Sequence, residues 1–214
     1  MKKIALIAFA SIFLVTACKK KVESSTMVVK VPKFELIGPT AFSTPAGPGS
    51  YVDPGVKYTD ESGVESTITT PTTSDVNLAA PGFYSCSYEL KTDHGYKLKA
   101  SRLVLVTPVS PSDDYSGVYA RTSNGQTVNV TKIGTGLYTT DNVGGVAANN
   151  AFIFDVYFGL LNDTDIVVPL QPNVVGGGEL YCDQAKFHDN GATQSFQWVV
   201  RGAGFGTSLR KFVK

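Results

Sequence analysis

Large and small side chains alternate along one stretch in the first half of this chain. The large residues Tyr84, Cys86, Tyr88 and Leu90 are separated by Ser85, Ser87 and Glu89. This period of two is typical of a β-strand with one buried face. Turn-forming residues stand on both sides, at 81–82 and at 93–95. The pattern predicts a half-buried strand bounded by turns.

The second half of the chain is predicted to contain eight short strands. They cover residues 117–121, 127–133, 137–141, 152–158, 166–168, 180–187, 196–201 and 209–213. Turn signals rich in glycine and asparagine separate them, and no stretch has a convincing helical period. Short strands with short connections predict an antiparallel meander that closes as a β-sandwich or a barrel.

Composition agrees with an all-β protein. Charged residues make up 17% of the chain, and its 21 glycines and 11 prolines are typical of strands and turns. The formal net charge is +1. A balance so close to neutral argues against nucleic acid as a partner.

The chain begins with a segment typical of an export signal. It has a positive head at 1–3, an apolar run at 4–15 and small residues at 16–17. The run is too short to cross a bilayer comfortably as a helix. With Cys18 directly after it, this segment resembles the lipobox of bacterial lipoproteins. The resemblance implies a signal peptide over 1–17, a lipid on Cys18 and a membrane as partner.

Residues 18–26 are then expected to form a lipidated tether. The lysines at 19–21 would be attracted to anionic lipid by about 1 kcal/mol each at the surface, but a solvated tether is the preferred interpretation. The acidic export signals that follow the cysteine in many Bacteroidota lipoproteins are missing. We therefore expect an outer-membrane location, and the cell surface and the periplasmic face are the two alternatives for it.

Residues 27–107 carry a series of motifs in a recognisable order. The motifs are Asp53-Pro-Gly-Val56, Pro81-Gly-Phe-Tyr84 with Tyr88, Asp93-His-Gly95 and Arg102-Leu-Val-Leu-Val106. They resemble the bacterial immunoglobulin-like domain of pesticidal crystal toxins and of many Bacteroidota surface lipoproteins. Phe83 replaces the usual threonine, and His94-Gly95 replaces Gly-Asn. The resemblance implies an Ig-like β-sandwich, a fold that serves as spacer, adhesion unit or binding platform alike.

Residues 115–214 follow a proline-containing linker over 108–114. Their landmarks are Tyr115-Ser-Gly-Val-Tyr119, Asp141-Asn-Val-Gly-Gly145, Phe196-Gln-Trp198 and a closing segment over 205–214. These look like the C-terminal module of small two-domain Bacteroidota lipoproteins, which are commonly encoded with outer-membrane glycan-import systems. The resemblance implies an accessory glycan-binding protein of a polysaccharide-utilisation system. The alternative is a structural or adhesion scaffold that binds other envelope proteins through a sheet edge.

No catalytic constellation is recognised. Nucleophilic catalysis needs a serine or cysteine beside an oriented base, and His94 and His188 fall in different predicted domains. A glycosidase needs two carboxylates about 5 to 9 Å apart. No motif pairs the candidates Asp155, Glu179, Asp183 and Asp189, although their geometry is left open. We therefore expect no enzyme and no cofactor.

We predict no metal site from the cysteines and carboxylates. Cys86 and Cys182 are interpreted as free thiols that pack as small hydrophobes, because two separate cores would rarely bring them within the ~7 Å that a disulfide needs. A disulfide or a metal pair is the alternative. Calcium between the domains, on Asp113 and Asp114 with carboxylates of the first domain, is disfavoured because calcium-loop spacings are missing.

Sugar binding requires an exposed aromatic face with amide or carboxyl groups around it. The candidates are Tyr157, Tyr181, Trp198 and Phe205, with Asn149, Asn150 and Asn173 on nearby loops. Trp198 alternates with Phe196 and Val200 and is expected in the core. Tyr157 and Phe205 lie beside loops and are predicted to be the ligand-binding residues. The glycine-rich segment 202–206 around Phe205 is interpreted as a flexible hairpin loop.

Overall fold

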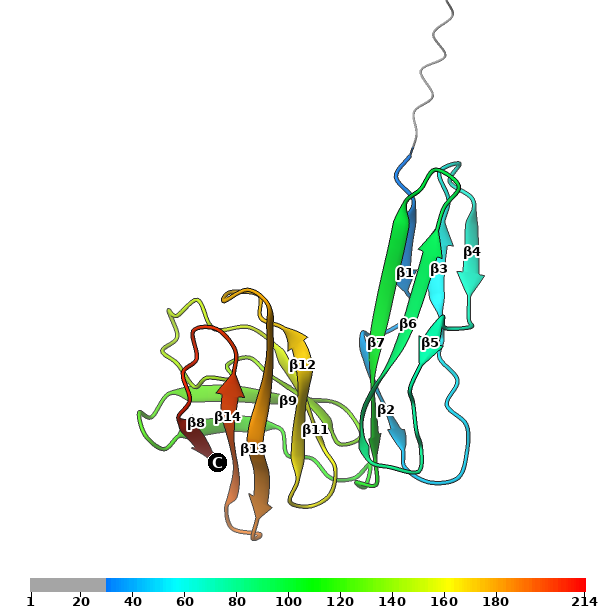
Figure 1. Ribbon diagram of the computed structural model, residues 1–214. Helices are drawn as coiled ribbons and strands as arrows, with labels where there is room; N and C mark the ends of the chain where they lie inside the picture. Colours follow the sequence, from blue (N-terminus) through cyan, green and yellow to red (C-terminus); the bar gives the residue numbers. More distant parts are fainter. Residues whose placement is uncertain (1–29) are drawn as a thin grey trace, which may run out of the picture. The chain divides into compact units, whose positions relative to one another are not determined.

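The computed structural model describes residues 30–214, and every regular element in this part of the chain is a β-strand (Figure 1). The all-β prediction is confirmed for these residues. The predicted signal peptide and the whole predicted tether, including Cys18, lie outside them. Within 30–214 there is no helix long and apolar enough to span a membrane.

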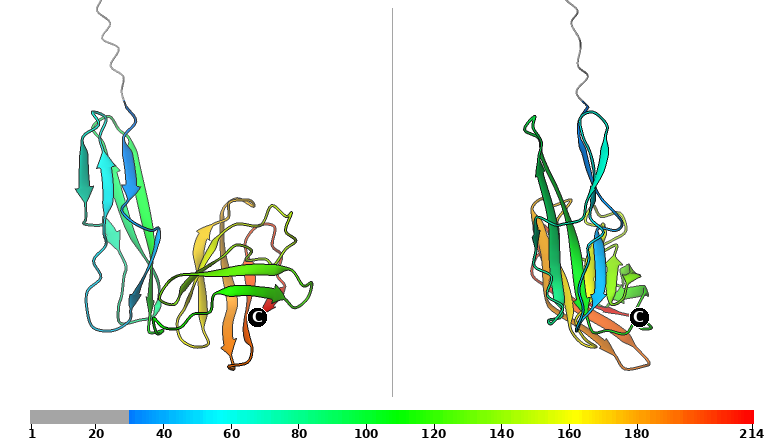
Figure 2. Two further views of the ribbon diagram at one scale, coloured as in Figure 1. Left: turned by 180° about the vertical axis from the view of Figure 1, so that it is seen from behind. Right: turned by 90° about the vertical axis from the view of Figure 1, so that its right-hand side faces the viewer.

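The first seven strands form two sheets. Their bounds are β1 (Lys33–Leu36), β2 (Ala41–Pro45), β3 (Val56–Thr59), β4 (Glu65–Ile68), β5 (Thr73–Ser74), β6 (Gly82–Lys91) and β7 (Lys97–Thr107). One sheet has the order β1-β3-β4 and the other β2-β7-β6-β5. Figure 2 shows β6 and β7 as the long hairpin of this part. We call residues 33–107 the two-sheet module.

A small core lies between these sheets. Val56, Cys86, Tyr88 and Val104 are its buried members, contributed by β3, β6 and β7. The alternation predicted around Tyr84 to Leu90 is confirmed, since Cys86 and Tyr88 are buried and their neighbours are more exposed. The chain changes sheets between β1 and β2, where β2 pairs with β7 in parallel. The other strand pairs in the module are all antiparallel.

The remaining eight strands close into a barrel. Their bounds are β8 (Gly117–Arg121), β9 (Thr127–Gly134), β10 (Leu137–Thr140), β11 (Val156–Leu160), β12 (Ile166–Pro172), β13 (Glu179–Asp189), β14 (Gln194–Arg201) and β15 (Leu209–Val213). Each strand pairs antiparallel with the next, and β15 returns to β8. The predicted meander is confirmed, and of the two closures considered the barrel is the one observed.

Two strand boundaries in the barrel differ from the prediction by four residues, and the others by no more than two. β11 begins at Val156 rather than near 152, because Phe152 is held in a turn in which its N–H donates to Oδ1 of Asn150 (2.8 Å). β12 continues beyond Val168 to Pro172. Its register shifts between Val168 and Gln171. Such a bulge accommodates Pro169, which has no N–H for a ladder hydrogen bond.

Aromatic side chains fill the barrel. Trp198, Phe196, Phe212, Tyr138 and Tyr119 are all buried, and the ring centroids of Phe196 and Trp198 lie 4.5 Å apart. Trp198 is fully buried, which confirms its predicted place in the core, and its indole N–H donates to the carbonyl of Val143 (2.8 Å). An eight-stranded barrel is just wide enough to be filled by its own side chains. A ligand of this module would therefore bind on its outer surface or at its ends.

The two-sheet module and the barrel share a third apolar cluster. Its buried members are Ala41, Leu105 and Leu137. The hydroxyl of Thr107 donates to the carbonyl of Leu160 (2.7 Å), and Gly159 lies so close to Leu105 that a Cβ there would be 2.6 Å from its side chain. The contact therefore depends on packed side chains and not only on the prolines of the connecting segment.

Candidate functional site

Phe205 is not an exposed platform. Only 7% of it is exposed, and its ring packs against Phe152 with the centroids 4.9 Å apart. The buried guanidinium of Arg210 donates to the carbonyls of Phe205, Gly144 and Ser208 and so holds the loop against the barrel end. The expectation of an exposed Phe205 is wrong, because Arg210 provides an anchor that the sequence pattern does not show. The segment 202–206 lies in the hairpin loop between β14 and β15, as interpreted from the sequence.

Tyr157 lies at the contact between the two modules. It is half-buried and packs against the cluster of Ala41, Leu105 and Leu137. Its hydroxyl lies 2.8 Å from Oγ1 of Thr40. The ring is thus engaged within the chain, and it offers little free face for stacking on a sugar.

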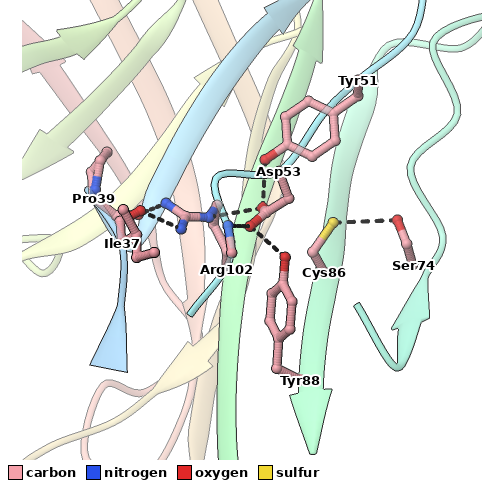
Figure 3. Close-up of polar contacts among 9 residues, drawn as sticks. Ile37, Pro39, Tyr51, Asp53, Ser74, Cys86, Tyr88 and Arg102 are labelled. Carbon is pink, nitrogen blue, oxygen red and sulfur yellow. Dashed lines mark hydrogen bonds and ion pairs between the residues drawn. The ribbon is translucent and has the colours of Figure 1, made fainter. Parts of the chain in front are cut away.

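A buried ion pair lies in the two-sheet module (Figure 3). Nε of Arg102 lies 2.9 Å from Oδ2 of Asp53, and both side chains are almost completely buried. The hydroxyls of Tyr51 and Tyr88 donate to the same carboxylate at 2.8 and 2.7 Å, and the Gly55 N–H donates to it at 2.8 Å. The carboxylate therefore has three hydrogen bonds in addition to the cation.

The other end of Arg102 holds the segment where the chain changes sheets. Its guanidinium donates to the carbonyl of Ile37 (2.8 Å) and to that of Pro39, and both residues lie between β1 and β2. Those carbonyls accept no hydrogen bond from a neighbouring strand at the crossover. A carbonyl that is shielded from water and has no donor lowers the stability of the fold, so the guanidinium stabilises this segment. The network thus connects β7, the loop before β3 and the crossover, and its burial indicates a structural role.

The network also perturbs the titration of its members. Burial alone would raise the pKa of Asp53, but hydrogen bonds from Tyr88, Gly55 and Tyr51, together with the charge of Arg102, hold it below its usual value. Burial and the hydrogen bonds to Asp53 raise the pKa of both tyrosines. Asp53 is therefore a carboxylate and both tyrosines are neutral donors near neutral pH.

Low pH is expected to lower the free energy of unfolding of the two-sheet module, because Asp53 becomes protonated. A carboxyl whose pKa is lowered by folding stabilises the native state above the unfolded-state pKa of about 3.9, and that stabilisation is lost as the pH falls through the lower folded-state value. Urea midpoints measured from about pH 6 to about pH 3 should fall, and Asp53→Asn should reduce the steepness of the fall. An unchanged steepness in the variant would contradict this assignment.

The histidines and cysteines do not converge on a site. Cys86 is buried beside Oγ of Ser74 (3.3 Å), and burial raises the pKa of its thiol. Cys86 and Cys182 are free, as interpreted from the sequence. His94 lies 3.3 Å from Glu61 on the surface, and His188 lies on β13. Within residues 30–214 there is no group of three or more His, Cys, Asp or Glu side chains placed to hold a metal ion.

Tyr181 provides an exposed aromatic face on the barrel. It is 45% exposed, which makes it the most exposed aromatic residue among the described residues of the barrel. It points outward because Leu180 before it is buried and Cys182 after it packs on the core. Across the strand pair it faces Arg201, whose Nε lies 2.7 Å from Oδ2 of Asp183. A stacking surface therefore lies beside a half-exposed carboxylate and guanidinium.

Backbone irregularities surround this tyrosine. β12 has a register shift beside it, where Leu170 is 55% exposed, and β13 has another between Asp183 and Lys186. Gln184, within the second shift, has φ of 53°, the one positive φ of a non-glycine residue in the described chain. Oδ1 of Asp183 is buried without a hydrogen-bond partner. Bulges and strained residues are frequent at binding sites. We call Leu170, Tyr181, Asp183 and Arg201 the Tyr181 face.

No protein-family model matches the sequence, and no curated protein matches it. Among solved structures, the chain is similar to the lipoprotein BT2262 from Bacteroides thetaiotaomicron, with 20% sequence identity and a TM-score of 0.41. The match covers 86% of this chain and 100% of that chain.

Proposed function

We propose that this protein is a lipid-anchored component of the outer membrane whose barrel recognises a glycan at the Tyr181 face. The observation that carries this proposal is the exposed ring of Tyr181 beside the Asp183–Arg201 pair. Sugar recognition uses an aromatic surface for the C–H face of a pyranose and polar groups at its rim for the hydroxyls. The filled barrel interior supports an external site.

The two-sheet module acts, in this proposal, as an Ig-like spacer between the anchor and the barrel. Its two packed sheets and the parallel β2–β7 pair agree with that architecture. Its largest buried polar feature is the Asp53–Arg102 pair, which is enclosed and so supports a structural role. The setting is that of an accessory protein of polysaccharide utilisation, as the resemblance of the C-terminal motifs implies.

Tyr181→Ala tests the glycan assignment. In native affinity gels with soluble polysaccharides, the mature chain should be retarded by at least one polymer. The variant should bind that polymer about tenfold more weakly, equivalent to ~1.4 kcal/mol. Tyr96→Ala is the matched control, because Tyr96 is an exposed tyrosine in the other module. Equal retardation of Tyr181→Ala and wild type would contradict the site.

Cys18→Ser tests the anchor. The substitution removes the thiol to which lipid would be attached, and so the lipidated mature chain should be lost and the uncleaved precursor, which keeps its apolar segment at 4–15, should accumulate. Mass spectrometry that finds the intact precursor without lipid would support the lipobox interpretation. Unchanged processing, with the mature chain still in the membrane fraction, would contradict it. Cys86→Ser is the control, because Cys86 is buried in the two-sheet module.

A scaffold that binds envelope proteins through a sheet edge is the second candidate. The observation that favours it is β4, an edge strand that pairs only with β3 in its sheet and is exposed over most of its length. An edge strand offers unpaired backbone groups to another chain. Retardation by no polysaccharide, with envelope proteins retained in pull-downs and lost with Thr67→Pro, would favour the scaffold over the glycan-binding protein.

A further inference from the structure

The face that includes Tyr181 continues along β14 as a groove. Outward residues of β14 form its floor, and outward residues of β13 and β15 form its walls. The registers place Asp183, Val199 and Leu209 in one row, and Lys186, Gln197 and Lys211 in the next. His188, Ser195 and Val213 form a third row, at the end near the β13–β14 turn. We call this surface the β14 groove.

Burial shows that two positions of the floor are recessed. Ser195 and Val199 alternate with the core residues Phe196, Trp198 and Val200 and so point outward, yet they are only 7% and 2% exposed. On the walls, Tyr181 and Leu209 are 45% and 48% exposed. Ser195 and Val199 therefore lie below the side chains of the strands on both sides, whereas Gln197 and Arg201 are part-exposed.

The end of the groove near the β13–β14 turn widens into a cavity. It has a volume of about 580 Å³ and is lined by polar groups that include Asp163, His188, Asp189, Thr193, Ser195 and Lys211. This end is built partly by the loop before β12, because the N–H of Phe187 donates to the carbonyl of Thr164 (2.7 Å). The cavity thus has a shape and donors and acceptors of its own, away from Tyr181.

The charges along the groove largely compensate one another. Arg201 pairs with Asp183, and Lys186 pairs with Asp165. The carboxylate of Asp189 accepts hydrogen bonds from the Gly191 N–H and the Gln194 amide, and these hold its pKa below the usual value. Lys211 and Asp163 add one charge of each sign to the cavity lining. The three cations and four carboxylates named here leave a single negative charge. Mixed donors and acceptors with this small negative balance suit hydroxyl groups better than an anionic polymer.

The length of the groove constrains the ligand. Ser195 and Arg201 lie six residues apart on β14, and so the two ends are separated by about 20 Å at ~3.3 Å per residue. A monosaccharide cannot contact both ends at once. We infer that the groove binds an internal segment of a neutral polysaccharide, with one residue on Tyr181 and another in the cavity lined by His188 and Lys211. This inference rests on the proposed glycan-binding function.

The experiment has two stages and uses the mature chain. Starch, xylan, galactomannan, mixed-linkage β-glucan and, as the anionic probe, polygalacturonate are first tested in native affinity gels. Oligosaccharides of increasing length from each retarding polymer are then titrated by calorimetry. Affinity should rise by about tenfold or more from the disaccharide to the longest oligomer, because the second subsite contributes only when the chain reaches it.

Variants test how much each end of the groove contributes to binding. His188→Ala/Lys211→Ala should weaken binding of the longest oligomer by about tenfold and leave the disaccharide unchanged. His94→Ala/Lys97→Ala removes the same residue types from the surface of the other module and should change neither. Retardation by a polymer with no length dependence, or with no effect of the cavity variant, would overturn this inference and leave the proposed function intact. Retardation by polygalacturonate alone would overturn the neutral ligand. Retardation by no polymer would overturn both.

Discussion

Replacing Arg102 with methionine is expected to lower the free energy of unfolding by about 3 to 5 kcal/mol. Methionine fills much of the same space but leaves the Asp53 carboxylate buried without its cation. It also leaves the carbonyls of Ile37 and Pro39 without a donor. Removing one member of a buried pair costs more than the pair itself contributes, because the remaining charge stays buried.

Urea unfolding followed by far-UV circular dichroism measures this effect. Lys99→Met is the matched control, because it lies on the same strand with an exposed side chain paired only to Glu89 at the surface, and it should change stability by less than about 1 kcal/mol. Asp53→Asn combined with Arg102→Met should cost less than the sum of the single changes, because both residues belong to one network. A loss below about 1 kcal/mol for Arg102→Met would contradict the role given to this pair.

The strands were predictable because successive side chains of a strand point to opposite faces, so that a strand with one buried face alternates in sequence. Tyr84 to Leu90 keep a strict period of two, and each barrel strand is bounded by residues that favour turns. β12 was the exception, since the sequence indicated a strand over 166–168 only, and pairing with β13 shows that it continues past Pro169 through a bulge. Barrel closure depends on β15 meeting β8, a contact between distant segments that no local pattern encodes.

Site residues were less predictable because exposure depends on what packs against a side chain. Phe205 follows glycines, which favoured a free loop, but Arg210 anchors that loop from a neighbouring strand. Tyr157 stands beside a loop, yet the first module covers it. For Tyr181 a signal was present in the sequence. Leu180 and Cys182 flank it as apolar residues of the opposite face, so the period of two directs Tyr181 outward.

The single tryptophan allows the unfolding of the barrel to be followed separately from that of the two-sheet module. Trp198 lies in the barrel core, far along the chain from Asp53 and Arg102, and so its fluorescence reports on the barrel. The cluster of Ala41, Leu105 and Leu137 joins the modules by packing. If that contact makes unfolding cooperative, Arg102→Met shifts the fluorescence midpoint and the circular dichroism midpoint together. If the modules unfold independently, the fluorescence midpoint stays at its wild-type value.

Replacing Trp198 with alanine is expected to cost about 3 to 5 kcal/mol. Its ring touches an aromatic cluster, with centroids 4.5 Å from Phe196, 5.5 Å from Phe158 and 5.7 Å from Phe212. These partners belong to three different strands, so they cannot close over the cavity together without moving the barrel wall. The alanine variant also leaves the carbonyl of Val143 without its indole donor.

Trp198→Phe separates packing from the hydrogen bond. Phenylalanine keeps most of the ring contacts and loses the donor, so we expect a smaller cost of about 1 to 3 kcal/mol. Because both variants remove the tryptophan, unfolding is followed by far-UV circular dichroism and by the near-UV signal of the barrel tyrosines. Costs that were equal for alanine and phenylalanine would show that the bond to Val143, and not the aromatic packing, fixes this part of the barrel.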